Sequence, residues 1–181
     1  MTVRDSPLPE DALLQRYRHG PTGDDGSTYT DCYRTRVAGR VLLADYVYAF
    51  YTTWLFRLER RILQYVVRKP SSDHAARELA DGLIADFAAW HVEARTPTEL
   101  LMCDFQGRTR SWFMVEPEFE YGVAFTALRF GSAVVPKGDK DSVQAQGLVY
   151  RKLLPFHRLY SRLLLRAAAL RLCRNTHDVG Y

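Results

Sequence analysis

The sequence predicts an α+β fold in which a curved antiparallel sheet packs on one long C-terminal helix, with two or three helices inserted after the first strand. Segments with a hydrophobic period of two follow one another between residues 87 and 135, which is typical of half-buried strands. The last apolar stripe, from about Leu148 to Arg174, has the period of an amphipathic helix. The 181 residues, 47% of them hydrophobic and 25% charged, suit a single globular domain.

The N-terminal residues 1–26 are rich in proline and glycine and contain the acidic pair Asp24-Asp25. They predict a mobile leader with at most a short helix over Asp11–Arg18. The domain is expected over residues 27–175, followed by a tail over 176–181. Its first strand is expected at Ser27–Val37, because the β-branched and aromatic side chains there fit a pleated, half-buried surface.

The segment Leu43–Arg68 changes to a helical period, with apolar residues at steps of three and four. Thr52 and Thr53 disfavour an unbroken helix, because β-branched side chains lose rotamer freedom there. One long helix and two helices meeting near Thr53 both fit the pattern. Ser72 then caps a second short helix that Gly82 ends.

The next fifty residues alternate with period two and are expected to form a meander. Four strands are predicted here: Phe87–Arg95, Leu100–Phe105, Thr109–Glu116 and Ala124–Val135. Gly107 and Gly122 mark tight turns, since glycine readily adopts positive φ. Pro117 is expected to end the third of these strands, and residues 139–147 read as a polar loop.

The predicted C-terminal helix carries the basic charge of the chain. The formal net charge is +4, and residues 142–177 hold seven basic residues and no acidic one. Pro155 either begins the main helix or kinks it. Three arginines spaced by four form a basic row: Arg158, Arg162 and Arg166. This row fits contact with an anionic membrane, with phosphates, or simply with solvent.

Several classes of protein are excluded or disfavoured. The three cysteines, at positions 32, 103 and 173, are far apart, so they predict neither a zinc site nor a disulfide scaffold. There is no cofactor fingerprint and no nucleic-acid-binding motif, so neither a metal, a cofactor nor a nucleic-acid partner is expected. The N-terminus has no apolar secretory segment, and no stretch approaches the roughly 18 apolar residues of a spanning helix. A cytoplasmic location is expected.

The order of strand, helices, strand meander and long helix resembles the helix-grip superfamily of START and polyketide-cyclase-like proteins. The resemblance covers about residues 27–174 and implies a cavity between a curved sheet and the last helix. The five predicted strands are fewer than the six or seven of that superfamily; a further strand near Gly82–Phe87, or a split of Ala124–Val135, would restore the number. A cystatin-like fold is the competing prediction, but it lacks a long closing helix. Three stretches resemble an uncharacterised bacterial protein family, without implying a role: Phe56–Arg60, Gly107–Trp112 and Phe130–Pro136.

The resemblance implies an apolar ligand of the lipid, polyketide, isoprenoid or quinone class, with a polar or acidic head. Polar and aromatic residues on the predicted strands and last helix are the candidate contacts: His91, Arg110, Trp112, Arg129 and Tyr160. A guanidinium at Arg110 would bind a carboxylate, and Trp112 would stack on the ligand. In the alternative interpretation these strand residues form the solvated outer face of the sheet, with ion pairs such as Glu93–Arg110.

Two other functions fit the sequence. An enzyme in the same cavity, such as a cyclase, dehydratase or isomerase, would use His91 or His157 as general base. Cys103 alternates with apolar neighbours, which predicts an inert buried thiol, and no catalytic residue is assigned. An interaction module would instead use the basic C-terminal helix against a membrane or an acidic partner.

Overall fold

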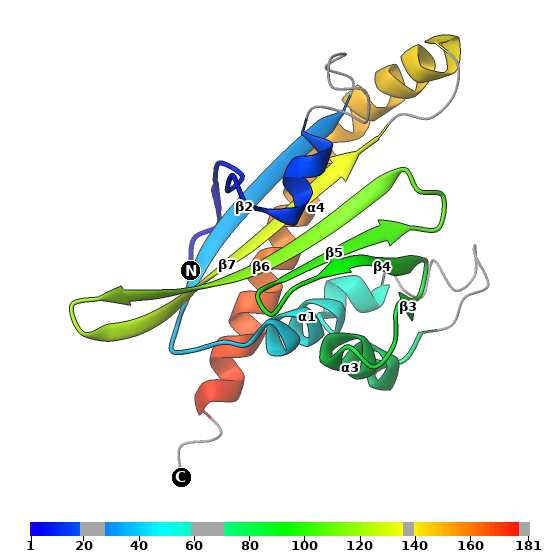
Figure 1. The fold of residues 1–181 in the computed structure, drawn as a ribbon. Helices are drawn as coiled ribbons and strands as arrows, with labels where there is room; N and C mark the ends of the chain where they lie inside the picture. The colour runs from blue at the N-terminus through cyan, green and yellow to red at the C-terminus, as the bar shows by residue number, and fades with distance from the viewer. Residues whose placement is uncertain (19–27, 59–70, 136–139, 178–181) are drawn as a thin grey trace.

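The computed structural model describes residues 1–18, 28–58, 71–135 and 140–177. Within them, seven antiparallel strands form one sheet in the order β1-β2-β7-β6-β5-β4-β3 (Figure 1). The strands are β1 (Arg4–Asp5), β2 (Tyr29–Ala38), β3 (Asp86–Phe87), β4 (Trp90–Arg95), β5 (Glu99–Asp104), β6 (Thr109–Glu120) and β7 (Val123–Val134). The helices are α1 (Leu43–Tyr51), α3 (Asp73–Asp81) and α4 (Lys140–His177), with a 3-10 helix η1 (Leu13–Tyr17). The predicted α+β fold is confirmed, with β1 and β3 added to the five expected strands.

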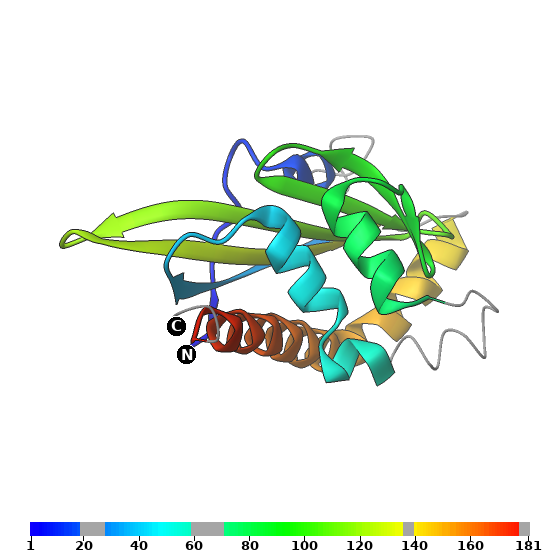
Figure 2. The same ribbon diagram turned by 90° about the horizontal axis from the view of Figure 1, so that it is seen from below.

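The sheet separates two layers of unequal thickness. The helices α1, α3 and α4 cover one face, which we call the inner face, and η1 lies on the opposite, outer face (Figure 2). Because side chains alternate along a strand, neighbouring residues serve different cores. Phe113 and Leu128 pack with the helices, whereas Trp112 and Ala133 pack beneath η1.

The local signals for the short helices are confirmed. The Ser72 hydroxyl accepts a hydrogen bond from the Ala75 N–H at 3.0 Å, and Gly82 ends α3 with φ +79°. The helix that begins at Leu43 stops at Tyr51, and a second helical segment occupies residues 54–58. Of the two alternatives at Thr53, the structure therefore has two helices; the expected continuation to Arg68 lies outside the described residues beyond position 58.

The β6–β7 hairpin corrects one prediction. Tyr121 and Gly122 both have positive φ, as the expected tight turn requires. However, β6 continues through Pro117 to Glu120. The Val115 N–H points toward β5, where it donates to the Thr98 carbonyl at 3.0 Å, so the ring nitrogen of Pro117 faces the same side. Because β5 begins only at Glu99, no strand of the sheet needs a donor from Pro117 there.

The N-terminal residues differ from the leader that was expected over residues 1–26. β1 pairs with the edge of β2, and Leu14 of η1 is fully buried against the outer face. Glu99, itself buried, accepts hydrogen bonds from the Leu13 N–H at 2.8 Å and from the Trp112 indole at 2.6 Å. Residues 1–18 therefore pack on the domain, and residues 19–26 lie outside the described ranges.

The backbone of α4 also extends beyond its predicted start. It is helical from Lys140, where a polar loop was expected over 139–147, and Pro155 lies inside it. Gln and Ala in this stretch are good helix formers, and polarity by itself does not distinguish an exposed helix from a loop. The helix packs against β2, β7 and α1.

Candidate functional site

A cavity of about 200 Å³ lies between the inner face and α4. Its apolar wall is aromatic and is formed by Phe50 and Tyr51 of α1, Trp90 of β4 and Phe130 of β7, together with Leu164 of α4. These residues face inward because each falls on the strand or helix position that alternation assigns to the main core. The cavity predicted between sheet and last helix is therefore present, although it is small.

The rest of the cavity wall is polar. Asp104, Thr109 and Ser111 contribute from the β5–β6 hairpin, and α4 contributes Tyr160 and Ser161. Hydroxyl groups both donate and accept hydrogen bonds, so this wall can orient an uncharged polar group. An apolar pocket with a few polar groups is the usual form of a small-molecule site.

A buried carboxylate stands behind the polar wall. The side chain of Asp31, on β2, is 5% exposed and accepts hydrogen bonds from the Ser132 N–H at 2.9 Å and from Ser132 Oγ at 2.7 Å. The hydroxyls of Tyr33 and Tyr29 donate to its Oδ2 at 3.1 and 3.2 Å. His157 of α4 places Nε2 2.7 Å from Ser132 Oγ and 3.6 Å from Asp31 Oδ2. This network joins β2, β7 and α4 at one side of the cavity, which Ser132 and His157 line.

The positions of the protons follow from this geometry. Burial by itself would raise the pKa of Asp31, but hydrogen bonds from His157 and Ser132 lower the pKa below its ordinary value, so the carboxylate is ionised at neutral pH. An ionised carboxylate only accepts hydrogen bonds, so the Ser132 hydroxyl donates to Asp31. The Ser132 oxygen then accepts from His157, which requires a hydrogen on Nε2.

The network therefore differs from a nucleophilic triad. In a triad the serine hydroxyl donates to the histidine, and the carboxylate binds the other ring nitrogen. Here Ser132 donates to Asp31, and both groups lie beside the same nitrogen of His157. His157 thus acts as a hydrogen-bond donor that ties α4 to the sheet, and Ser132 is not activated for attack.

Four of the five predicted contact residues lie on the outer face, away from the cavity. The expectation that His91, Arg110, Trp112 and Arg129 line it is wrong, because alternation gives the inner face to their immediate neighbours. Only Tyr160 lies at the cavity.

The side chains of the outer face bind one another. Arg110 Nε donates to Glu93 at 3.0 Å, and its guanidinium lies 4.5 Å from the ring centroid of Tyr17. Arg129 pairs with Glu116 at 3.0 Å and donates to Ser6 Oγ at 2.8 Å. The Glu93–Arg110 ion pair of the alternative interpretation is thereby confirmed.

The other two predicted residues of the outer face have no cavity contact either. Trp112 is fully buried under η1, with its indole N–H on Glu99, so it presents no stacking surface to a ligand. His91 is exposed and pairs with Cys103 across β4 and β5. A role for His91 as general base in the cavity is therefore excluded by its position.

Asp31, Ser111 and Ser132 were not among the five predicted contact residues. A signal for two of them was available. Asp31 shares the parity of the buried Tyr33 in β2, and Ser132 shares the parity of the buried Phe130 in β7. Polar residues at apolar positions of a strand indicate a buried network.

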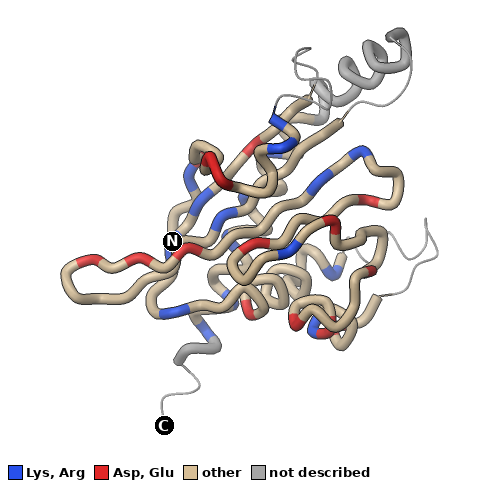
Figure 3. The backbone as a smooth tube through the Cα atoms, in the orientation of Figure 1, with Lys and Arg blue, Asp and Glu red and all other residues tan. Residues whose placement is uncertain are grey.

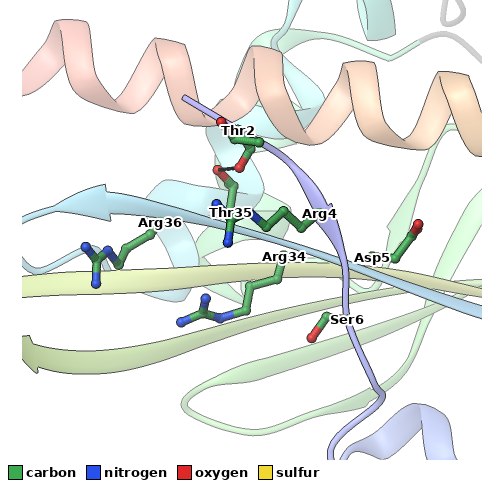
Figure 4. Close-up of a pocket in the computed structure, with 7 residues that line it drawn as sticks. All are labelled: Thr2, Arg4, Asp5, Ser6, Arg34, Thr35 and Arg36. Carbon is green, nitrogen blue, oxygen red and sulfur yellow. Dashed lines mark hydrogen bonds between the residues drawn. The ribbon is translucent and has the colours of Figure 1, made fainter.

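A second hollow lies at the sheet edge, outside the main core. It has a volume of about 440 Å³ and is lined by Thr2, Arg4, Asp5, Ser6, Arg34, Thr35 and Arg36 (Figure 4). The N-terminal chain crosses the edge of β2 there, and the Thr35 hydroxyl donates to the Thr2 carbonyl at 3.1 Å.

Two of the three arginines that line this hollow are paired with carboxylates. Arg34 pairs with Glu118 and Arg36 pairs with Glu120, both on the acidic β6–β7 hairpin (Figure 3). These contacts cross β7 and neutralise the charge of β2. Arg34 and Arg36 therefore have a structural role, because they link β2 to the β6–β7 hairpin.

The described residues also bear on metal binding, on disulfides and reactive thiols, and on membrane-spanning helices. They hold no group of three or more His, Cys, Asp or Glu side chains suited to a metal ion. The three cysteines, all of them described, form no disulfide. Burial raises the pKa of the Cys32 thiol to about 11, so it stays protonated and unreactive. Among the described helices, none has both the length and the apolar character needed to cross a bilayer.

Comparison with known proteins adds no assignment: no protein-family model matches the chain, and no curated protein matches it significantly. The helix-grip resemblance therefore stays a prediction beside the confirmed fold class.

Proposed function

We propose that the protein binds a small apolar molecule with a neutral polar head in the cavity between the inner face and α4. The observation that carries this proposal is the pairing of an aromatic wall with a hydroxyl-rich wall backed by the Asp31–Ser132–His157 network. The volume of about 200 Å³ is below the roughly 300 Å³ at which drug-sized pockets begin. A one- or two-ring compound, or the end of a longer lipid, polyketide, isoprenoid or quinone, suits this size.

A neutral head is favoured over the acidic head that the sequence also allowed. The arginines expected to bind a carboxylate lie on the outer face, and no arginine or lysine appears among the described residues that line the cavity. The charged residue in its wall is Asp104, which would repel an anion. Hydroxyl, keto and quinone groups match the remaining donors and acceptors.

The location in the cell is part of the same proposal. Cys32 and Cys103 are buried thiols that form no disulfide, which suits a reducing compartment such as the cytoplasm.

The first experiment is native mass spectrometry of the protein purified from a bacterial host, followed by solvent extraction of any bound compound. Affinity is then measured for 2-naphthol and 2-naphthoate, which share a ring system and differ in head-group charge. We expect 2-naphthol to bind more tightly, and to raise the unfolding temperature as its concentration rises.

Two variants test whether binding occurs in this cavity. Ser111→Leu fills space at the polar wall, and it should weaken 2-naphthol binding by about tenfold or more through lost volume and hydrogen bonding. Thr98→Leu, at an exposed position before β5, is the matched control and should bind like wild type. Equal affinity in all three proteins, or tighter binding of 2-naphthoate, would contradict the proposal.

Catalysis in the same cavity is a second candidate, favoured by the position of His157 beside a buried, ionised carboxylate. A cyclase, dehydratase or isomerase would need such a group to move a proton. The test compares small-molecule extracts incubated with wild type and with His157→Gln. A compound consumed by wild type alone would establish an enzyme, whereas unchanged extracts would favour binding without turnover.

A further inference from the structure

The outward side of α4 is apolar although it faces solvent. Phe156, Leu159, Leu163 and Leu170 follow one another at helical spacing, and their exposed fractions run from 68% at Phe156 to 41% at Leu170. The opposite side of the helix is buried in the main core. The stripe from residue 156 to 170 extends over about 20 Å of helix at a rise of 1.5 Å per residue. A continuous exposed apolar stripe of this kind marks a docking surface.

The same surface continues beyond α4 onto the segment 54–58. Trp54 is 72% exposed and shares a hollow of about 440 Å³ with Leu170. Arg57, Arg171 and Arg174 line this hollow together with the two apolar side chains, and of these Arg57 is paired with Asp73. Tryptophan prefers the boundary between water and lipid, where its ring is apolar and its N–H remains hydrated.

The charges around the stripe are positive. Between Leu154 and Arg174 the helix carries five arginines and no acidic residue. Arg166 and Arg174 are exposed beside the stripe. In the basic row identified from the sequence, Arg162 instead pairs with Asp5 and lies over the Tyr33 ring. The surface is therefore an apolar stripe with a cationic rim, whose complement is an anionic partner.

This charge pattern distinguishes between the possible occupants. A second copy of the chain would bring two all-positive helices together about a two-fold axis, with like charges facing one another. A bilayer with anionic headgroups would instead accept the apolar side chains at the acyl boundary and pair with the arginines. We propose that the outward side of α4, together with Trp54, docks on an anionic phospholipid bilayer.

Docking in this orientation does not depend on the cavity being occupied. It nevertheless has a consequence for the cavity, because the inward side of the same helix contributes Tyr160, Ser161 and Leu164 to the cavity wall. A docked protein would hold the cavity next to the membrane, where an apolar ligand partitions.

Vesicle flotation of the full chain tests the proposal. Binding is expected to vesicles of phosphatidylcholine with phosphatidylglycerol, to weaken between about 0.1 M and about 1 M salt, and to be much weaker on phosphatidylcholine alone. The fluorescence of Trp54 offers a second readout, since Trp112 is fully buried and Trp90 partly so. Bound protein should show a blue-shifted emission that Trp54→Phe removes.

The double variant Leu159→Ser/Leu163→Ser should reduce vesicle binding by about tenfold or more, because two apolar contacts with the acyl region are lost. Phe119→Ser/Val123→Ser, at the exposed tip of the β6–β7 hairpin, is the matched control and should bind normally. Both positions on α4 are exposed, so the fold should survive, which thermal unfolding verifies.

Three outcomes would overturn the proposal. One is the absence of binding to anionic vesicles at low salt. Another is equal loss in the α4 and hairpin variants. The third is a concentration-dependent dimer, seen by analytical ultracentrifugation, that Leu159→Ser/Leu163→Ser dissociates; that result would assign the surface to a second copy of the chain.

Discussion

The two faces of the sheet use polar residues in different ways. On the outer face, Arg110 binds Glu93 across β5, Arg129 binds Glu116 on the adjacent strand β6, and Glu99 holds η1 in place. On the inner face, the Asp31–Ser132–His157 network leaves hydroxyl and imidazole groups at the wall of a cavity. Charge on a strand therefore does not by itself mark a binding site. A site needs polar groups beside unfilled space, and the cavity at the inner face provides both together with an aromatic wall.

The largest expected effect comes from the outer face. Trp112→Ala should lower the free energy of unfolding by about 3–5 kcal/mol, because it removes a fully buried indole and leaves Glu99 without that donor. Urea unfolding measures the loss, and Tyr121→Ala at the hairpin tip should change stability little. The protein that stays folded should bind 2-naphthol normally; weaker binding would show that the two faces are coupled.

The inner network should be nearly as important for stability. Asp31→Asn keeps the size of the side chain but replaces an acceptor by a donor toward groups that already donate, so we expect a loss of about 2–3 kcal/mol. Asp45→Asn on the half-exposed start of α1 is the control. Unlike Trp112→Ala, this variant should also weaken 2-naphthol binding, since Ser132 and His157 lose their support. Unchanged affinity would separate the network from the site.

The pH dependence of stability should report the same carboxylate. The folded pKa of Asp31 lies below its unfolded value, so its contribution is complete above the unfolded value, about 3.9, and is lost as pH falls through the folded one. Urea unfolding between neutral and strongly acidic pH should show wild type losing more stability than Asp31→Asn. Parallel curves for the two proteins would mean that Asp31 is not held in its charged form.

The smallest effect belongs to the Glu93–Arg110 pair. Its side chains are 20% and 13% exposed, and a double-mutant cycle with Glu93→Gln and Arg110→Gln should give a coupling energy of about 1 kcal/mol. Neither variant should alter 2-naphthol affinity. A tenfold change in affinity would show that Arg110 contributes to ligand binding. The outer face would then share in the binding site.

Much of the local structure could be predicted because its causes are local. Ser72 begins α3 with a side-chain cap, and Gly82 ends the helix with a positive φ. Both effects depend on adjacent residues alone. Tyr121-Gly122 similarly produces the hairpin turn. The prediction that Pro117 ends its strand was wrong, and the packing of residues 1–18 on the sheet was not predicted, because both depend on residues distant in sequence. Whether Pro117 costs a hydrogen bond depends on where β5 begins, and η1 is stabilised by Glu99 from far along the chain.

The candidate site was predicted only in outline. The sequence indicated a cavity under the last helix and named Tyr160 and His157, but it assigned the arginines and Trp112 to the wrong face. A hydrophobic period of two shows which residues of a strand share a face. It does not show which of the two faces meets the core. Asp31 and Ser132 are polar residues that share a strand face with buried apolar residues. This position was the better indication of the site.

The sequence by itself determined the α+β class, the turns and caps, and the amphipathic character of α4, because these follow from periodicity and from backbone preferences of single residues. The tertiary structure alone decided which sheet face meets α4, and therefore which polar residues line the cavity. It also decided that Phe156, Leu159, Leu163 and Leu170 on the outward side of α4 are exposed. The physical reason is that burial and charge pairing bring together residues that are distant in sequence, such as Asp31 and His157. No local sequence pattern predicts such a contact.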